Sequence, residues 1–166
     1  MNQVPRERLS FLQRVIEKET RHLDYSAGQV AAVTFTAEKA AALVDDEVLA
    51  EKVEAFTSRF ARLQDTVGDK LLPNWLRALG EQVGAAIDNL DKAEKLGMLA
   101  SADQWLEIRQ LRNQMVHEYI ESPEVLGNAL ETAKAYHPVM TAFAQAMLDD
   151  LRTRGILMPA QDAKAE

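Results

Sequence analysis

Apolar residues recur at steps of three and four along most of the chain, which is the spacing of one face of an α-helix. Leu9, Leu12, Val15, Ile16 and Leu23 predict a first helix from about Pro5 to His22. The segment 28–45 begins with a short β-prone run and becomes alanine-rich, which predicts a short helix capped by Thr36. These segments therefore indicate helices from the N-terminal part of the chain onward.

A long helix is expected from a cap at Asp45 or Asp46 towards Leu71. Its apolar stripe consists of Val48, Leu49, Val53, Phe56, Phe60 and Leu63. Proline lacks the backbone N–H that a helix needs, so Pro73 should end or kink this helix. A further helix is then expected around Trp75, Leu76 and Leu79.

Three more helices are predicted in the second half of the chain. One carries Ile87, Leu90, Ala93 and Leu96 and ends at Gly97, a residue suited to the left-handed conformation that closes a helix. The next opens with Ser101-Ala102-Asp103-Gln104, which fits a capping box, and runs through Trp105, Ile108, Leu111 and Met115 to Tyr119. The last begins at Ser122-Pro123 and reaches about Arg154, with a bend expected at Pro138.

The pattern as a whole predicts an all-α fold, a single up-and-down helical bundle of about five to six helices. One domain over residues 1–166 fits the chain length, with 159–166 as a flexible tail. The first 26 residues lack the apolar core of a signal peptide, and the longest weakly polar stretch is too short to span a bilayer. We therefore expect a cytoplasmic protein that does not enter a membrane.

The amino-acid composition excludes several kinds of functional site. The chain has no cysteine, which excludes disulfides, thiolate metal sites and cysteine nucleophiles. Its 19 Lys and Arg against 26 Asp and Glu give a formal net charge of −7, which argues against a broad basic surface that coats nucleic acid. His117-Glu118 has no second histidine four residues on, so no zinc motif is present, and we expect no cofactor.

The most informative stretch is Leu111-Arg112-Asn113-Gln114-Met115-Val116-His117-Glu118-Tyr119. It resembles the RX4HXY signature of HEPN domains, specifically the HepT-like toxins that are paired with a minimal nucleotidyltransferase. The run from Ala86 to Leu99 is similar to the helix that precedes this signature in the family. The resemblance covers roughly residues 56–119, and the rest matches only as a helical bundle.

The resemblance implies a homodimer whose arginines and histidines line one cleft and cleave RNA without a metal, as the toxin of a type VII-like toxin–antitoxin system. On this chain Arg112 and His117 would be catalytic, and Asn113 would orient the phosphate. Tyr119 would be the residue that the nucleotidyltransferase antitoxin adenylylates to silence the toxin. The alternative is a non-catalytic HEPN protein that binds nucleotide or serves as the substrate-binding partner of a nucleotidyltransferase. An inert helical scaffold is a third possibility.

The residues themselves suit this chemistry. RNA supplies its own nucleophile, the 2′-hydroxyl, so a histidine that titrates near neutral pH can move the protons. A guanidinium such as that of Arg112 suits the charge that develops on phosphorus. The alternative without a function is that Arg112 and His117 are ordinary surface residues near a helix end.

Helix geometry limits how the pair can act together. At 3.6 residues per turn, Arg112 and His117 point about 140° apart. The helix must therefore bend near Val116, or a second subunit must complete the site.

Other candidates have weaker support. His22 and His137 are expected at the surface or at helix ends. Asp65, Asp69 and Lys70 could approach the cleft, and Arg59, Arg62, Lys70 and Arg77 could form a positive strip for phosphate. For both groups the sequence pattern favours a solvated helix face.

Overall fold

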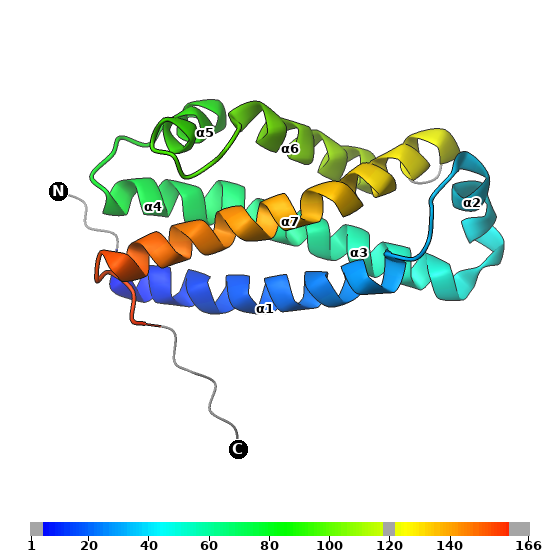
Figure 1. The fold of residues 1–166 in the computed structure, drawn as a ribbon, viewed down its shortest axis with the longest axis horizontal. Coiled ribbons are helices and arrows are strands. Elements are labelled where there is room, and N and C mark those ends of the chain that lie inside the picture. The colour runs from blue at the N-terminus through cyan, green and yellow to red at the C-terminus, as the bar shows by residue number, and fades with distance from the viewer. Residues whose placement is uncertain (1–4, 118–121, 160–166) are drawn as a thin grey trace, which may run out of the picture.

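The fold comes from a computed structural model, which describes residues 5–117 and 122–159. Four long helical runs alternate in direction along the molecule (Figure 1). They are α1 (Arg6–Val30), α3 (Glu47–Asp65) continued by α4 (Leu72–Ala78), α6 (Ala102–His117) and α7 (Pro123–Thr153). Short helices cross the two ends of the bundle: α2 (Ala37–Ala41) with η1 (Ala42–Asp45) at one end and α5 (Ala86–Lys95) at the other. The predicted all-α, up-and-down bundle is confirmed.

The caps expected from the sequence lie at the starts of the helices. The side chains of Thr36, Asp46 and Ser122 accept hydrogen bonds from the backbone N–H three residues on, at 3.1, 3.1 and 3.3 Å. Ser101 does the same for Gln104 at 3.1 Å. Gly97 follows α5 with a φ of +74°, the left-handed conformation that glycine adopts without strain.

The first helix is longer than predicted. It continues past His22 to Val30, so the residues from Gly28 to Val30 are helical and not extended. Leu23, Ser26 and Val30 are buried and continue the three- and four-residue steps of Leu9, Leu12 and Ile16. Packing of this face against α3 and α7 outweighs the local β propensity.

Pro73 neither ends nor separates the helices around it. The chain runs from α3 through a π-helical segment, η2 (Thr66–Leu71), directly into α4, and Pro73 lies in the first turn of α4. In a regular α-helix the ring of a proline at this position would clash with the carbonyl four residues back. The wider π turn accommodates the ring. The helix α7 likewise continues through Pro138.

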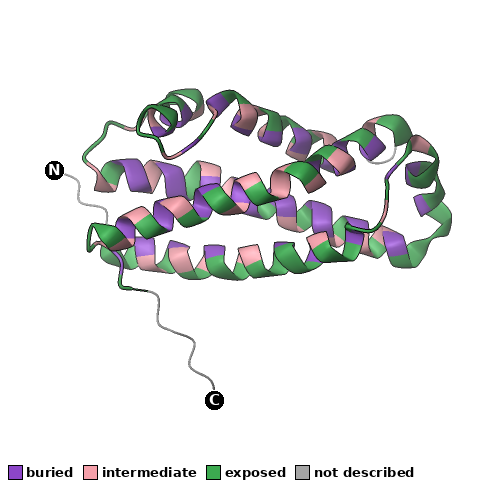
Figure 2. Ribbon diagram, in the orientation of Figure 1, coloured by how far each residue is buried: buried purple, intermediate pink, exposed green. Residues whose placement is uncertain are grey.

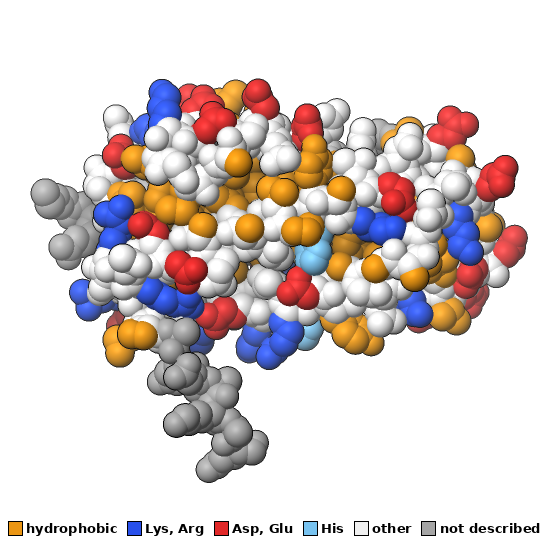
Figure 3. Space-filling model, viewed as in Figure 1, with side chains coloured by type: hydrophobic (Ala, Val, Ile, Leu, Met, Phe, Trp, Pro, Cys, Tyr) orange, Lys and Arg blue, Asp and Glu red, His pale blue; other side chains and the backbone are white. Residues whose placement is uncertain are grey.

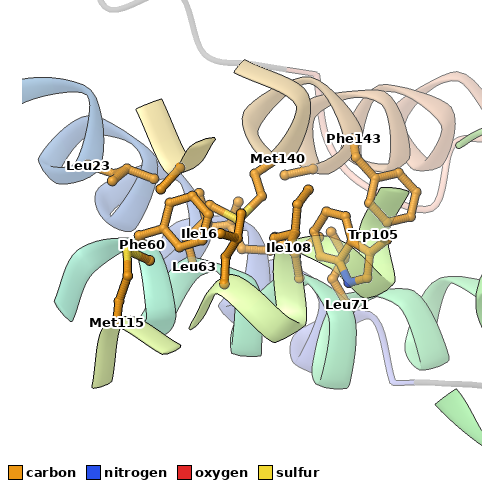
Figure 4. Close-up of a cluster of buried hydrophobic side chains, with 14 of the residues drawn as sticks. Ile16, Leu23, Phe60, Leu63, Leu71, Trp105, Ile108, Met115, Met140 and Phe143 are labelled. Atoms are coloured by element: carbon orange, nitrogen blue, oxygen red, sulfur yellow. The ribbon is translucent and has the colours of Figure 1, made fainter. Parts of the chain in front are cut away.

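The long helices bury their apolar faces in one continuous core (Figure 2). Trp105 packs edge-on against Phe143 with ring centroids 5.1 Å apart, and Phe60 and Met115 lie in the same cluster (Figure 4). Three residues assigned to apolar stripes are instead exposed: Val48 (69%), Ile87 (51%) and Leu96 (46%). They lie at or near helix ends, where the bundle no longer covers them.

Acidic and basic side chains are mixed over the face drawn in Figure 3. Apolar side chains gather there along the seam between α5, α6 and α7. Among the described residues, no helix has the length and apolar character needed to cross a membrane.

Candidate functional site

The helix α6 sets the position of the sequence-predicted residues. Trp105, Ile108, Leu111 and Met115 are buried on its inner face, which fixes the rotation of the helix. Arg112 therefore falls at the border of the core, where its side chain is 29% exposed, and Asn113 lies next to it on the surface. Two predicted residues thus lie side by side at the edge of the bundle.

Arg112 is held by a carboxylate from a neighbouring helix. Its Nη2 donates to Oδ2 of Asp65 on α3 at 3.1 Å, and its Nη1 donates to Oδ1 of Asn113 at 3.3 Å. The Nε of Arg112 is buried and has no hydrogen-bond partner among the described residues. Because the ion pair is partly solvated, it stabilises the fold by only about 0.2–1 kcal/mol. Its main effect is to orient the guanidinium.

The guanidinium lines a cavity of about 320 Å³ between α3, η2 and α6. The cavity is lined by Gln64, Asp65, Asp69, Lys70, Arg109, Arg112 and Asn113. Three cationic side chains therefore face two carboxylates, in a chain whose net charge is −7. The cavity is polar and locally positive, which suits an anionic group.

The π segment shapes one wall of this cavity. In η2 the hydrogen bonds reach five residues back, as from the N–H of Leu72 to the carbonyl of Val67. Such π turns are frequent at functional sites because the extra residue re-aims the side chains around it. Here Asp69 and Lys70 are the exposed residues of the segment, and both line the cavity.

Gly68 permits α6 to approach this π segment closely. A Cβ atom at Gly68 would lie 3.0 Å from Nε1 of Trp105 and 3.2 Å from Nε2 of Gln64. Both nitrogens are buried without a hydrogen-bond partner in the described part of the chain. A side chain at position 68 would require Trp105 or Gln64 to shift by a few tenths of an ångström.

One cavity contains Arg112 together with Asp65, Asp69 and Lys70. The sequence pattern had favoured a solvated helix face for the last three residues. The residues of the predicted positive strip have different surroundings. Lys70 and Arg77 line surface cavities. Arg59 instead donates to Oγ of Ser26 at 2.7 Å and to the carbonyl of His22 at 3.1 Å.

Sequence reasoning missed Gln64 and Arg109, both of which line the cavity. Arg109 had a signal, because it lies three residues before Arg112 and so on the same side of the helix.

The structure describes the side chains of two of the four predicted site residues, Arg112 and Asn113. His117 is the last residue of α6, and its side chain lies outside what the structure describes. Tyr119 also lies outside the described residues, as does 160–166 of the predicted tail. The helix α6 extends without interruption from Ala102 to His117.

Two other titratable groups have clear environments. His137 lies within α7 and not at a helix end, and its Nε2 is 2.6 Å from Oδ1 of Asp24 on α1. Burial raises the pKa of Glu19, although a hydrogen bond from Thr66 and the nearby charges of Arg62 and Lys70 partly offset it. Within residues 5–117 and 122–159, no three acidic or histidine side chains are grouped closely enough to hold a metal ion.

Comparisons with protein-family models, with curated proteins and with solved structures give no significant match for the chain.

Proposed function

We propose that this chain is a metal-independent endoribonuclease of the HepT-like HEPN type, the toxin of a toxin–antitoxin pair that acts in the cytoplasm. The observation that carries the proposal is the position of Arg112. Its guanidinium lines a polar, locally positive cavity beside Asn113, with Arg109 and Lys70 on the same walls. The resemblance of residues 112–119 to the RX4HXY signature supports the same function.

The reaction is an attack of the ribose 2′-hydroxyl on the adjacent phosphorus. The 2′-oxygen–phosphorus bond forms as the phosphorus–5′-oxygen bond breaks, which gives a 2′,3′-cyclic phosphate and a 5′-hydroxyl. His117 takes the 2′-hydroxyl proton or gives one to the leaving oxygen. Arg112 stabilises the negative charge that develops on the non-bridging oxygens, and Asn113 orients the phosphate.

Asp65 fits this scheme as a positioning residue. It accepts from Nη2 of Arg112 at 3.1 Å and holds the guanidinium at the cavity wall. A guanidinium that is already oriented loses less conformational freedom when it binds a phosphate.

The site is completed in a homodimer. On one straight helix Arg112 and His117 point about 140° apart, so the two residues of one chain cannot both face one phosphorus without bending the helix. The His117 of a second copy, placed against the first copy's Arg112, removes this conflict. The antitoxin partner is a minimal nucleotidyltransferase, which silences the toxin by transferring adenylate to Tyr119.

A non-catalytic role remains the second candidate, and the ion pair favours it. Asp65 neutralises Arg112 at 3.1 Å, so the guanidinium already has a counter-charge before any ligand binds. In that case the cavity holds a nucleotide, or the chain presents a substrate to the nucleotidyltransferase without cleaving RNA.

The deciding experiment uses purified full-length chain, single-stranded RNA and excess EDTA. We expect the wild type to cleave the RNA, and His117→Ala and Arg112→Ala to lose about 10²–10⁴-fold in rate. Arg14→Ala, an exposed arginine on α1 that lines neither the Arg112 cavity nor its neighbour, is the matched control and should retain the wild-type rate. Equal background cleavage by all four proteins would refute the enzymatic proposal.

The regulatory half of the proposal has a separate test. The chain is incubated with a purified nucleotidyltransferase encoded beside it and ATP, and then analysed by mass spectrometry. We expect one adenylate on Tyr119, with loss of RNA cleavage, and no adenylate on Tyr119→Phe. Stable binding without adenylate transfer, together with no RNA cleavage, would favour the non-catalytic role.

A further inference from the structure

A second hollow adjoins the Arg112 cavity on the other side of the π segment. It has a volume of about 550 Å³ and lies between the start of α1, η2, α4 and the start of α5. Its charged residues are Arg8, Asp69, Lys70 and Arg77. Asp69 and Lys70 line both hollows, so the two lie next to each other at η2, and together they are called the track.

The track is positive in a chain that is negative. The two hollows together carry five cations, Arg8, Lys70, Arg77, Arg109 and Arg112, against the carboxylates of Asp65 and Asp69. Its net charge of +3 contrasts with −7 for the whole chain. Such local focusing lets an acidic protein hold an anion at one place while it repels anions elsewhere.

The cations of the second hollow are free to bind a ligand. Within the described part of the chain, no carboxylate lies within ion-pair distance of Arg8, Lys70 or Arg77. All three side chains are exposed, and among the described residues Arg77 makes only a long contact of 3.4 Å with Oδ1 of Asn74. Lys70 and Arg77 are seven residues apart along η2 and α4, which places them about two helical turns apart on one side.

Another part of the lining is held by hydrogen bonds between a side chain and the backbone. The buried side chain of Asn89 accepts from the N–H of Gly84 at 2.9 Å and donates to the carbonyl of Gly84 at 3.2 Å. The loop before α5 is therefore held in place, and the hollow exists before a ligand binds.

The lining also indicates which part of a ligand is bound. No aromatic side chain lines either hollow in the described residues, so the track offers no surface on which bases could stack. Arginine and lysine side chains beside a polar wall favour phosphate oxygens, which carry no sequence information.

We propose that this track binds the backbone phosphates of the RNA strand that flank the bond cleaved at Arg112. The inference rests on the proposed function for the position of the scissile phosphate. Arg8 and Arg77 bind the distal phosphates, and Lys70 bridges between them and the Arg112 cavity. Short substrates that end at the scissile phosphate do not reach Arg8 and Arg77.

The first test measures binding without cleavage. A fluorescent single-stranded RNA of about 12 nucleotides is titrated with full-length His117→Ala protein over a range of salt concentrations. Adding Arg8→Gln and Arg77→Gln should weaken binding about tenfold at low salt and reduce the salt slope by about 1.4, since each lost phosphate contact contributes about 0.7 for a single strand. Asp69→Asn should strengthen binding.

The matched control removes two positive charges outside both hollows. Lys18→Gln with Lys39→Gln changes the net charge equally, and both lysines are exposed. We expect an affinity within about twofold of the parent protein. Equal weakening by the two double variants would mean that net charge, and not the track, controls binding, and would overturn the inference. Equally tight binding of polyglutamate would overturn it as well, in favour of an acidic protein partner.

The second test separates this inference from the proposed function. In the otherwise wild-type chain, Arg8→Gln with Arg77→Gln should slow cleavage of the longer RNA and leave cleavage of a dinucleotide unchanged. Cleavage of both substrates at the wild-type rate refutes the track and leaves the ribonuclease proposal intact. No cleavage by any protein, with RNA binding that still depends on Arg8 and Arg77, refutes the ribonuclease and leaves the track intact.

Discussion

Replacing Gly127 by alanine should loosen the contact that fixes the connection between α1 and α2. Gly127 lies on α7, and a Cβ atom there would be 2.8 Å from the carbonyl oxygen of Phe35 and 3.2 Å from that of Thr36. Both neighbours are backbone atoms, which cannot rotate away as a flexible side chain can. The connection itself must therefore move by several tenths of an ångström.

The cost of this movement follows from what else holds the connection. The N–H of Phe35 donates to Oε1 of Glu131 at 2.7 Å, and Lys134 donates to the carbonyl of Val33 at 2.5 Å. Overpacking of this kind costs about 1–3 kcal/mol. Alanine is favoured over glycine in a helix by about 0.5–1 kcal/mol, which offsets part of the cost. We expect a net loss of up to about 2.5 kcal/mol in the free energy of unfolding.

The measurement is urea unfolding followed by far-ultraviolet circular dichroism, with Gly28→Ala as the control. Gly28 lies near the end of α1, and a Cβ atom there meets nothing within 4 Å. That variant should gain up to about 1 kcal/mol from the reduced freedom of the unfolded chain. If Gly127→Ala gained as much stability as Gly28→Ala, the close packing of α7 on residues 35–36 would be refuted.

Three further variants test other parts of the structure by the same unfolding assay. Glu19→Gln should stabilise the protein near neutral pH, because burial raises the pKa of Glu19 and makes its ionised form costly there. The gain in stability should shrink as the pH falls through that pKa. A gain of the same size at acidic and at neutral pH would contradict this prediction. Asp150→Ala should lower the free energy of unfolding by about 1–3 kcal/mol. The buried Nε1 of Trp75 donates to Oδ2 of Asp150 at 2.8 Å and would be left without an acceptor. An unchanged stability would show that this hydrogen bond is unimportant. Asp46→Ala should cost about 1 kcal/mol by removing the cap of α3, and an unchanged stability would argue against that cap.

The starts of the helices could be predicted from the sequence because capping is local. Thr36, Asp46, Ser101 and Ser122 each accept a bond from a backbone N–H only three residues away, so the signal is complete within one turn. The same holds for Gly97, whose left-handed conformation closes α5. The prediction of an up-and-down helical bundle rested on these caps and on the apolar steps between them.

The errors occurred where packing over long distances decides the structure. Local propensity ended the first helix near His22, whereas burial of Val30 against the rest of the bundle extends it. The π segment before Pro73 was not predicted from the sequence, and its Gly68 lies close to Trp105. That contact joins residues 37 positions apart, which no local pattern indicates.

The candidate site could be predicted only on its own helix. The motif identified Arg112 and Asn113, and α6 places them together at the edge of the core. Asp65, which holds Arg112, lies 47 residues earlier, and its pairing depends on how α3 packs against α6. Asp65, Asp69 and Lys70 had the pattern of a solvated face, because sequence alone does not show which exposed face meets a neighbouring helix.

The central claim is that Arg112 and its cavity serve the cleavage of RNA by its own 2′-hydroxyl. It is tested most directly with a synthetic RNA and the same RNA carrying a single 2′-deoxynucleotide at the cleaved position, each incubated with the full-length protein in EDTA. The account predicts cleavage of the first, with a 2′,3′-cyclic phosphate at the new end, and none of the second at that position. Equal cleavage of both, or a new end without the cyclic phosphate, would contradict it.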